Sequence, residues 1–283
     1  MKILILGGNG MLGHQLFKYL SPNHSVRVTL RQPIEFYSKY KIFTNENAYA
    51  GMDIRSNDTI KGVLAEFRPD AVLNGIGIVK QREIAKKPIP SIEINALFPH
   101  KLAAICSRFG IRLIHMSTDC VFSGNKGNYR EEDLPDPNDL YGRTKLLGEL
   151  QQDEILTLRS SIIGRELTEK KNLLEWFLSQ TGKITGYKKA IFSGFTTLEM
   201  SRIIENLLVN FPAASGLYHV SSYPISKYDL LVLLRDKLNL NLEIAADETN
   251  ICDRSLDSIR FRREFAYIPP TWESMVDELI LNF

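Results

Sequence analysis

The sequence predicts an α/β protein with a doubly wound parallel sheet and a smaller C-terminal lobe. Between residues 2 and 164, short apolar runs alternate with amphipathic helical patterns, which is typical of parallel strands joined by helices. Small-residue loops follow the first and third apolar runs, where such sheets bind ligands. After Gly164 the alternation breaks. We therefore expect one domain over 1–164 and 191–222, and a lobe over 165–190 and 223–283.

The composition argues against several classes of function. The chain has 283 residues, of which 44% are hydrophobic and 24% charged, as in ordinary globular proteins. Lysine and arginine (35) nearly balance aspartate and glutamate (33), so no charge excess favours nucleic acid or an anionic membrane. No apolar run approaches the ~20 residues of a membrane span, and the N-terminal run stops at Gly7, too early for a signal peptide. Three cysteines without metal-ligand spacing predict no metal site and favour a reduced, cytoplasmic setting.

The N-terminal residues have the pattern of a dinucleotide-binding unit. An apolar, β-branched run over 2–6 meets a glycine turn, and leucines then recur at helical spacing before a second apolar strand over 26–30. The glycines fit two registers, with either Gly7 or Gly8 preceding Gly10 and Gly13. Such a turn lets the backbone approach a pyrophosphate at the helix N-terminus. The predicted cofactor-binding residues of this turn are Gly7, Gly10, Met11, Leu12 and Gly13.

The second strand ends at an arginine. NAD-preferring sites often place an acidic residue here, to bind the ribose 2′-hydroxyl. Arg31 occupies the region instead, and a guanidinium suits a 2′-phosphate in charge and in bidentate geometry. An ordinary surface arginine is the alternative. We expect NADP(H) as the preferred cofactor, ahead of NAD(H).

The next segment is expected to be irregular over 33–50 and helical over 57–67. Ala71-Val72-Leu73 predicts a buried strand. A second small-residue loop follows that could let a cofactor approach closely, and its candidate binding residues are Asn74, Gly75, Ile76 and Gly77. Two prolines and four basic residues over 79–90 predict a mobile loop near the site.

A proline interrupts the following helix, whose apolar stripe runs from Ile94 to Phe109. Pro99 has no N–H, so the carbonyl of Asn95 should lose its usual partner and the helix should kink. A freed carbonyl inside a protein needs a substitute partner, often water. The alternative is that Pro99 merely begins the helix.

Two further stretches carry hydroxyl and amine groups suited to proton transfer. Thr118 follows a strand over 111–116, at the carboxyl end where sites form in parallel sheets. Tyr141 and Lys145 are four residues apart on a helix expected to continue through Glu149, so they share one face. A phenol has a pKa of about 10, which a nearby cation lowers. The pair is a candidate general acid/base unit, with a solvated helix face as the alternative.

The remaining chain mixes helices and strands. Leu156 to Arg159 predicts a strand, and the strand over 216–220 is expected to return to the main sheet. Other elements expected after Gly164 are helices over 170–180, 198–210 and 228–238 and a short strand over 191–194.

Three motifs, in their order along the chain, resemble those of an extended short-chain dehydrogenase/reductase of the Rossmann fold. They are the glycine motif, Ser117 to Gly124, and Tyr141 to Glu149. More narrowly they resemble the dTDP-4-dehydrorhamnose reductase group, most strongly over 1–165 and weakly around Arg254 to Asp257. The resemblance implies an NADPH-dependent reductase of the 4-keto group of a nucleotide-linked deoxy or amino sugar. It would act in surface-polysaccharide sugar biosynthesis, with a homodimer left open.

The resemblance also implies residue roles. Thr118 would bind the reacting carbonyl, and Tyr141 would protonate the forming alkoxide. Lys145 would hold the nicotinamide ribose and lower the pKa of Tyr141, while the backbone carbonyl of Asn95 would order a proton-relay water. Asp53 and Ile54 would lie near the adenine. The implied substrate-binding residues are Thr118, Asp119, Cys120, Ser161 and Arg254.

Departures from the family pattern leave the substrate open among dTDP-, UDP- and GDP-linked sugars. The segment from Arg159 to Gly164 lacks the tryptophan of rhamnose-forming members, and a Gly-x-Pro-Thr pattern appears as Gly194 to Thr197. A dehydratase needs a glutamate after Thr118-Asp119, where this chain has Cys120. No histidine adjoins Cys120 in sequence, so we do not expect a nucleophile there. An NAD(P)-dependent nucleotide-sugar epimerase and a non-catalytic NADP-binding regulatory subunit remain alternatives.

Overall fold

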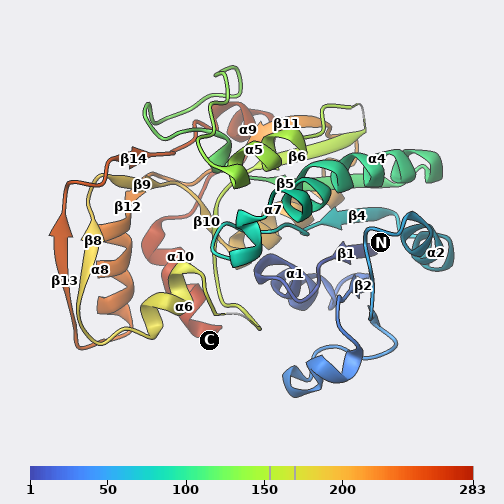
Figure 1. Ribbon diagram of the computed structural model, residues 1–283, viewed down its shortest axis with the longest axis horizontal. Helices are drawn as coiled ribbons and strands as arrows, with labels where there is room; N and C mark the ends of the chain where they lie inside the picture. The colour runs from blue at the N-terminus through green and yellow to red at the C-terminus, as the bar shows by residue number, and fades with distance from the viewer. Residues whose placement is uncertain (153, 169, 283) are drawn as a thin grey trace.

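A computed structural model describes residues 1–152, 154–168 and 170–282. Its centre is a seven-stranded sheet with the order β11-β6-β5-β4-β1-β2-β3, in which every neighbouring pair is parallel (Figure 1). The strands are β1 (Lys2–Leu6), β2 (Ser25–Thr29), β3 (Ala48–Tyr49), β4 (Ala71–Asn74), β5 (Arg112–Ser117), β6 (Ile155–Arg159) and β11 (Gly216–His219). The chain order reverses between β1 and β4, where such sheets bind ligands. The predicted doubly wound sheet and the return of β11 are confirmed.

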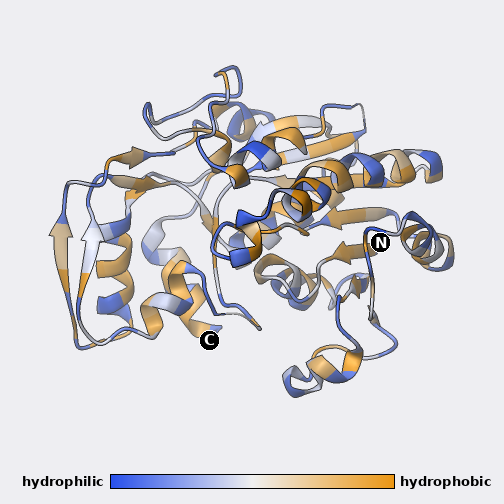
Figure 2. Cartoon of the chain, viewed as in Figure 1, coloured by the Kyte–Doolittle hydropathy of each residue, from blue (hydrophilic) through white to orange (hydrophobic). Residues whose placement is uncertain are grey.

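Helices cover both faces of the sheet. Side chains alternate along β1, so that Ile3 and Ile5 join one buried cluster and Leu4 and Leu6 join another. Helices α1 (Met11–Leu20) and α7 (Thr197–Val209) pack on the first face, and α2 (Asn57–Phe67) and α4 (Phe98–Phe109) on the second. Burial on both faces explains why the central strands β1 and β4 are nearly continuous apolar runs, visible as orange arrows in Figure 2.

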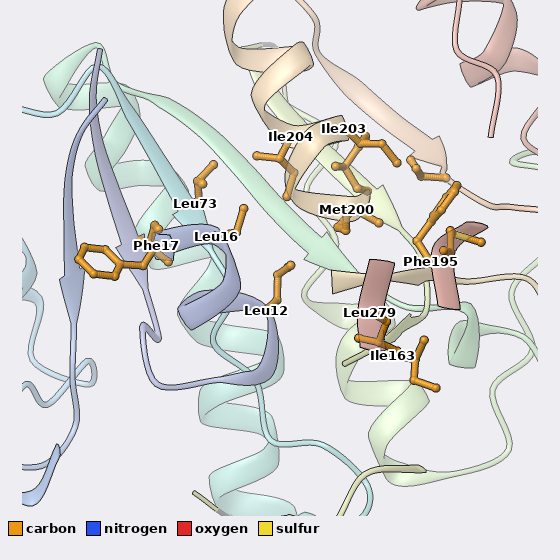
Figure 3. Close-up of a cluster of buried hydrophobic side chains, with 14 of the residues drawn as sticks. Leu12, Leu16, Phe17, Leu73, Ile163, Phe195, Met200, Ile203, Ile204 and Leu279 are labelled. Carbon is orange, nitrogen blue, oxygen red and sulfur yellow. The ribbon is translucent and has the colours of Figure 1, made fainter. Parts of the chain in front are cut away.

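The first cluster extends from the sheet into the C-terminal part of the chain. Leu12 and Leu16 of α1 lie toward Ile204 of α7, and Ile163 and Leu279 continue the same cluster (Figure 3). The two predicted units therefore share one hydrophobic core. The boundaries of these two units stay a prediction. The predicted lobe includes Glu169 and Phe283, which lie outside the described residues.

The C-terminal part forms its own small sheets, with β8 (Gly182–Tyr187), β13 (Leu242–Asp247) and α8 (Lys227–Lys237) at the left of Figure 1. The strand expected over 191–194 is β9 (Ala190–Phe192), which pairs with β12 and β14 rather than with the main sheet. The other elements here are β7 (Ile162–Ile163), α6 (Leu173–Leu178), β10 (Phe195–Thr196), β12 (Ile225–Ser226), β14 (Cys252–Asp253), α9 (Ile259–Glu264) and α10 (Trp272–Leu281). Helix α6 is shorter than the expected 170–180.

Two stretches without a predicted helix or strand contain short ordered elements. The residues over 33–50 include the 3₁₀ helix η1 (Ile34–Tyr40) and β3. The residues over 79–90 include η2 (Glu83–Lys86) and most of α3 (Pro88–Ser91). These elements are too short to produce a sequence repeat, so the periodicity argument could not detect them.

Pro99 lies inside a helical segment that is continuous from 88 to 109 and contains a π-turn. A π-helical turn, η3 (Ile92–Leu97), joins α3 to α4, and the N–H of Phe98 donates to the carbonyl of Glu93, five residues earlier. Pro99 is the second residue of α4, but Leu97 before α4 is itself helical (φ −74°, ψ −42°), so helical backbone precedes the proline. The alternative, that Pro99 merely begins the helix, is therefore wrong, while the expected kink and the freed carbonyl of Asn95 stay predictions. Single π-turns are frequent at functional sites, and this one carries Asn95.

Helix α5 (Leu140–Leu147) carries Tyr141 and Lys145. Asp139 begins it, because its carboxylate accepts a hydrogen bond of 2.7 Å from the N–H of Gly142. The expected continuation through Glu149 is wrong: the helix ends at Leu147, and Gly148 is its C-cap. A Cβ on Gly148 would lie 1.9 Å from the carbonyl oxygen of Asn95, so only glycine lets the two backbones approach this closely.

A buried polar chain joins the end of α5 to β6 and β11. Glu149 pairs with Arg159 through Nε–Oε1 and Nη2–Oε2 contacts of 2.8 and 2.7 Å, and Ser117 donates to the same carboxylate at 2.6 Å. Arg159 also donates to Nε2 of His219 at 3.1 Å. Because arginine only donates, His219 must be neutral with its proton on Nδ1, which donates to the carbonyl of Tyr129 at 3.0 Å.

We expect Gly148→Ala to lower the free energy of unfolding by about 1–3 kcal/mol, because its methyl group would collide with the Asn95 carbonyl. The matched control is Gly62→Ala in α2, where nothing lies within 4 Å of an added Cβ. There alanine should raise the free energy of unfolding by about 0.5–1 kcal/mol. Urea unfolding measures both. A Gly148→Ala protein as stable as the wild type would show that α5 is not held this tightly.

Stability should also fall with acidification because of His219. Burial and, to a smaller extent, Arg159 lower the pKa of His219 from 6.5 to about 4. The unfolded chain therefore binds more protons between these values, so the unfolding free energy should decrease as pH falls from 6.5 to 4, by on the order of 3 kcal/mol from this residue. Urea unfolding at pH 7 and pH 5 should show a smaller loss in His219→Gln than in the wild type. An equal loss in His219→Gln and in the wild type would contradict the assignment.

Candidate active site

The glycine turn after β1 is built so that side chains cannot fit. Gly7 has φ +84°, and the N–H of Gly10 donates to the Gly7 carbonyl at 2.9 Å. A Cβ on Gly13 would lie 2.1 Å from that carbonyl, and one on Gly8 would lie 2.4 Å from Cβ of Val28. Each of these three positions therefore requires glycine: Gly7 because of its positive φ, and Gly8 and Gly13 because a Cβ would collide with a neighbour. Gly10, the N-cap of α1, has no side chain over the free N–H groups, which suits a phosphate ligand.

Thr29, which sequence reasoning missed, holds this turn in place. Its hydroxyl accepts a hydrogen bond of 3.1 Å from the N–H of Gly7, and its carbonyl accepts one of 2.9 Å from Gly8. A hydroxyl-bearing residue at the end of the second strand was the available signal. Of the predicted turn residues, Leu12 is buried in the core, so only its backbone faces the turn. The sulfur of Met11 contacts Asn172 at the start of α6, at 3.1 Å.

The small-residue loop after β4 lies against the glycine turn. The N–H of Gly75 donates to the Leu6 carbonyl at 3.2 Å, and a Cβ on Gly7 would lie 3.0 Å from Cγ1 of Ile76. Asn74 stabilises the loop by accepting from the N–H of Ile76 at 3.2 Å. The two candidate cofactor loops are therefore neighbours, as expected at adjacent strand ends.

The side chain of Asn95 connects the small-residue loop after β4 to helix α5. Its side chain forms two hydrogen bonds with the backbone of Ile78, 2.8 Å to the N–H and 3.0 Å to the carbonyl, and a third of 3.3 Å to the Thr144 hydroxyl. The carbonyl of Asn95 meanwhile faces Gly148. The predicted relay role of that carbonyl stays a prediction; what the structure adds is a side chain that joins η3, the loop and α5.

Arg31 lies exposed just beyond β2, near two other groups of the predicted adenosine region. Asp53 forms a bidentate pair with Arg55, 2.9 Å from Nε and 2.8 Å from Nη2. These bonds, with a smaller contribution from Arg31, lower the pKa of Asp53 to about 2. Two guanidinium groups and one carboxylate leave the region net positive, which suits a 2′-phosphate. Ile54 is half-buried and packs against the α2 side of the core.

Thr118 begins the loop after β5 and is almost fully buried. Its hydroxyl accepts a 3.2 Å bond from the N–H of Cys120 and donates one of 3.2 Å to Asp119. Arg254, far away in sequence, reaches this loop: Nε donates to the Phe122 carbonyl at 2.8 Å, and Nη1 lies 3.9 Å from Sγ of Cys120. Burial, and then Asp119, raise the pKa of the Cys120 thiol to about 12, so it is no nucleophile at neutral pH.

Tyr141 and Lys145 share the inner face of α5, where Lys145 is buried and Tyr141 half-buried. Burial raises the pKa of the Tyr141 phenol, and a hydrogen bond with Thr118 opposes part of that rise. Burial lowers the pKa of Lys145 to about 8. Its ammonium donates to the carbonyl of Met116 at 2.7 Å. The predicted lowering of the Tyr141 pKa by Lys145 therefore stays a prediction, since in this structure the ammonium is bonded to β5.

Most predicted site residues thus meet at one edge of the sheet. Ser161 lies further out, beyond β6, where its carbonyl oxygen would be 2.2 Å from a Cβ on Gly194. Within the described ranges, no three or more His, Cys, Asp or Glu side chains are grouped so that they could hold a metal ion. No helix in the part of the chain that the structure describes has the length and apolar character needed to cross a membrane.

Comparisons with known proteins find several relatives. Residues 1–188 match the family described as the RmlD substrate binding domain. The chain is similar to the dTDP-4-dehydrorhamnose reductase of Aggregatibacter actinomycetemcomitans, with 23% identity over 96% of this chain and 96% of that protein. It is also similar to methionine adenosyltransferase 2 subunit beta of Bos taurus, with 27% identity over 52% of this chain and 41% of that protein.

Solved structures show the same fold. The dTDP-4-dehydrorhamnose reductase of Bacillus anthracis, in complex with NADP, superposes with a TM-score of 0.80 at 21% identity, over 100% of this chain and 99% of that one. The family match covers more than half of the chain and includes both glycine-containing loops, Thr118, Tyr141 and Lys145. The chain therefore belongs to the RmlD substrate binding domain family.

Proposed function

We propose that this protein is an NADPH-dependent reductase of the 4-keto group of a nucleotide-linked deoxy or amino sugar. The observation that carries the proposal is the position of Tyr141, beside Thr118 and one helical turn before Lys145, at the sheet edge that also bears the glycine turn. Similarity to dTDP-4-dehydrorhamnose reductases supports the reaction class. A reduced sugar nucleotide is a glycosyltransferase donor, in line with the predicted place in surface-polysaccharide biosynthesis.

The residues present fit an NADP cofactor. The turn from Gly7 to Gly13 offers uncapped N–H groups for a pyrophosphate, and the loop after β4 provides a second close backbone surface. Arg31 and Arg55 would hold the 2′-phosphate, while Asp53 would face the adenosine. The complex of the Bacillus anthracis relative with NADP supports this choice. When bound, NADPH supplies the hydride.

The chain's own residues supply the proton and the charge stabilisation. Thr118 would orient the ketone oxygen through its hydroxyl, and Tyr141 would donate its phenolic proton as negative charge develops there. Burial raises the pKa of Tyr141, which keeps the phenol protonated and ready to donate. Burial lowers the pKa of Lys145 only to about 8, so it is mainly an ammonium at pH 7 and can stabilise the remaining phenolate.

A second candidate is a binding subunit that holds NADP without turnover, which the similarity to methionine adenosyltransferase 2 subunit beta favours. NADPH oxidation by the purified chain with dTDP-, UDP- and GDP-linked 4-keto sugars separates the two. Turnover with one of these sugars supports the reductase. Tight NADP binding without turnover on any sugar of the panel would contradict it and favour the binding subunit.

We expect Tyr141→Phe to lower kcat by roughly 10²–10⁴-fold, because the proton donor is removed, while the Kd for NADPH stays nearly unchanged. The matched control is Tyr218→Phe, since the Tyr218 hydroxyl donates to Glu264 in α9 at 2.6 Å, away from the site. Steady-state kinetics and cofactor fluorescence measure the two quantities. A Tyr141→Phe enzyme with wild-type kcat would refute the role as acid.

We expect Arg31→Ala to weaken NADPH binding by about tenfold or more and NADH binding much less, because a charge-assisted bond to the 2′-phosphate is lost. Arg108→Ala, which removes an exposed arginine from the last turn of α4, is the control and should leave both Kd values unchanged. Equal weakening of NADPH and NADH by Arg31→Ala would show that the 2′-phosphate assignment is wrong.

A further inference from the structure

A buried carboxylate lies one turn beyond Lys145. Glu149 follows the C-cap of α5, and its side chain is only 3% exposed. The carboxylate accepts three hydrogen bonds, one from Ser117 at 2.6 Å and two from Arg159 at 2.8 and 2.7 Å. Arg159 is held in turn by His219 and by the ring of Phe122, 5.2 Å away. A carboxylate fixed on this many sides cannot reorient, so its charge has a permanent position.

The other groups around Lys145 cannot balance its charge. Tyr141 is a neutral phenol, and Asn95 on η3 is uncharged. On β5, His115 is fully buried, and burial and Lys145 lower its pKa well below the usual value. Asn74 uses its oxygen for Ile76, so its amide donates to Nδ1 of His115, at 3.0 Å, which leaves that ring neutral. Lys145 donates to the carbonyl of Met116 at 2.7 Å, and the next residue of β5, Ser117, donates to Glu149 at 2.6 Å, so the ammonium and the carboxylate bind adjacent residues of one strand. The charge of Glu149 accordingly raises the pKa of Lys145 against the effect of burial.

We infer that Glu149 is a positioning residue of the active site, whose carboxylate, held by Ser117 and Arg159, provides the fixed counter-charge for the Lys145 ammonium. The inference rests on the role of Lys145 in the proposed function. A buried ammonium without a counter-charge tends to lose its proton. Glu149 opposes that loss, as its effect on the pKa of Lys145 indicates. The ion pair with Arg159 would thus serve to hold the carboxylate in place rather than to stabilise the fold alone.

The test is a direct titration of Lys145 in the cofactor-free protein. The protein is labelled with ¹³C,¹⁵N-lysine, and the Lys145 signal is assigned by its loss in Lys145→Arg. In Glu149→Gln, which keeps the shape and removes the charge, the pKa of Lys145 should fall by about one unit or more. The matched control is Glu199→Gln in α7, another buried glutamate paired with an arginine, Arg202, at 3.0 Å. It should leave Lys145 unchanged.

A second variant keeps the test usable if Glu149→Gln fails to fold with its arginine unpaired. Glu149→Gln/Arg159→Gln removes both charges and should lower the pKa of Lys145 in the same way, because Arg159 is not among the groups that shift it. An unchanged Lys145 titration in the folded variant, or an equal shift in Glu199→Gln, would overturn the inference. The titration needs no turnover, so the two failures can be distinguished: a shifted Lys145 pKa in a protein that reduces no sugar would contradict the proposed function, while Glu149 would still be the counter-charge of Lys145.

Discussion

The close approach of α5 to its neighbours is the constraint on which the site depends. A Cβ on Gly142 would lie 2.2 Å from the carbonyl of Cys120, and one on Gly148 1.9 Å from the carbonyl of Asn95. These two contacts, six residues apart, fix the depth of the helix between the loop after β5 and the π-turn. Lys145 lies between these contacts and Tyr141 directly precedes the first, so backbone packing sets the position of both residues relative to the sheet.

Burial then gives the two residues complementary states. It raises the pKa of Tyr141, which keeps the phenol protonated, and lowers the pKa of Lys145 to about 8, close to where its charge would be lost. A proton donor needs its proton before the reaction and a cation beside it afterwards. The low polarity that keeps Tyr141 protonated also makes it harder for Lys145 to stay charged. The buried Glu149–Arg159 pair resolves this conflict, since it brings a fixed negative charge near Lys145 without exposing the site to water.

The sequence predicted the elements whose signals are local. The glycine turn, Thr118 at a strand end and the Tyr141/Lys145 spacing each depend on a few adjacent residues, and the structure brings them to one edge of the sheet. For Thr29, which accepts from Gly7 through its hydroxyl, the sequence offered only the weak signal of a hydroxyl at the end of a strand. The contact of Arg254 with the loop around Cys120 could not be predicted from local patterns, because it is made only after folding. The early end of α5 and the π-turn before Pro99 depend on tertiary packing that overrides helical periodicity. We expect irregular segments to bind the substrate sugar, and a single sequence gives the least information about the structure of such segments.

The measurement that tests the central claim most directly is the transfer of a label. NADPH carrying deuterium at C4 of the nicotinamide would be incubated with the purified chain and the panel of 4-keto nucleotide sugars, and the products examined by mass spectrometry and NMR. The account predicts deuterium on C4 of one product sugar with the wild type and a rate lower by roughly 10²–10⁴-fold with Tyr141→Phe. Tight NADPH binding with no deuterium transferred to any sugar would contradict it.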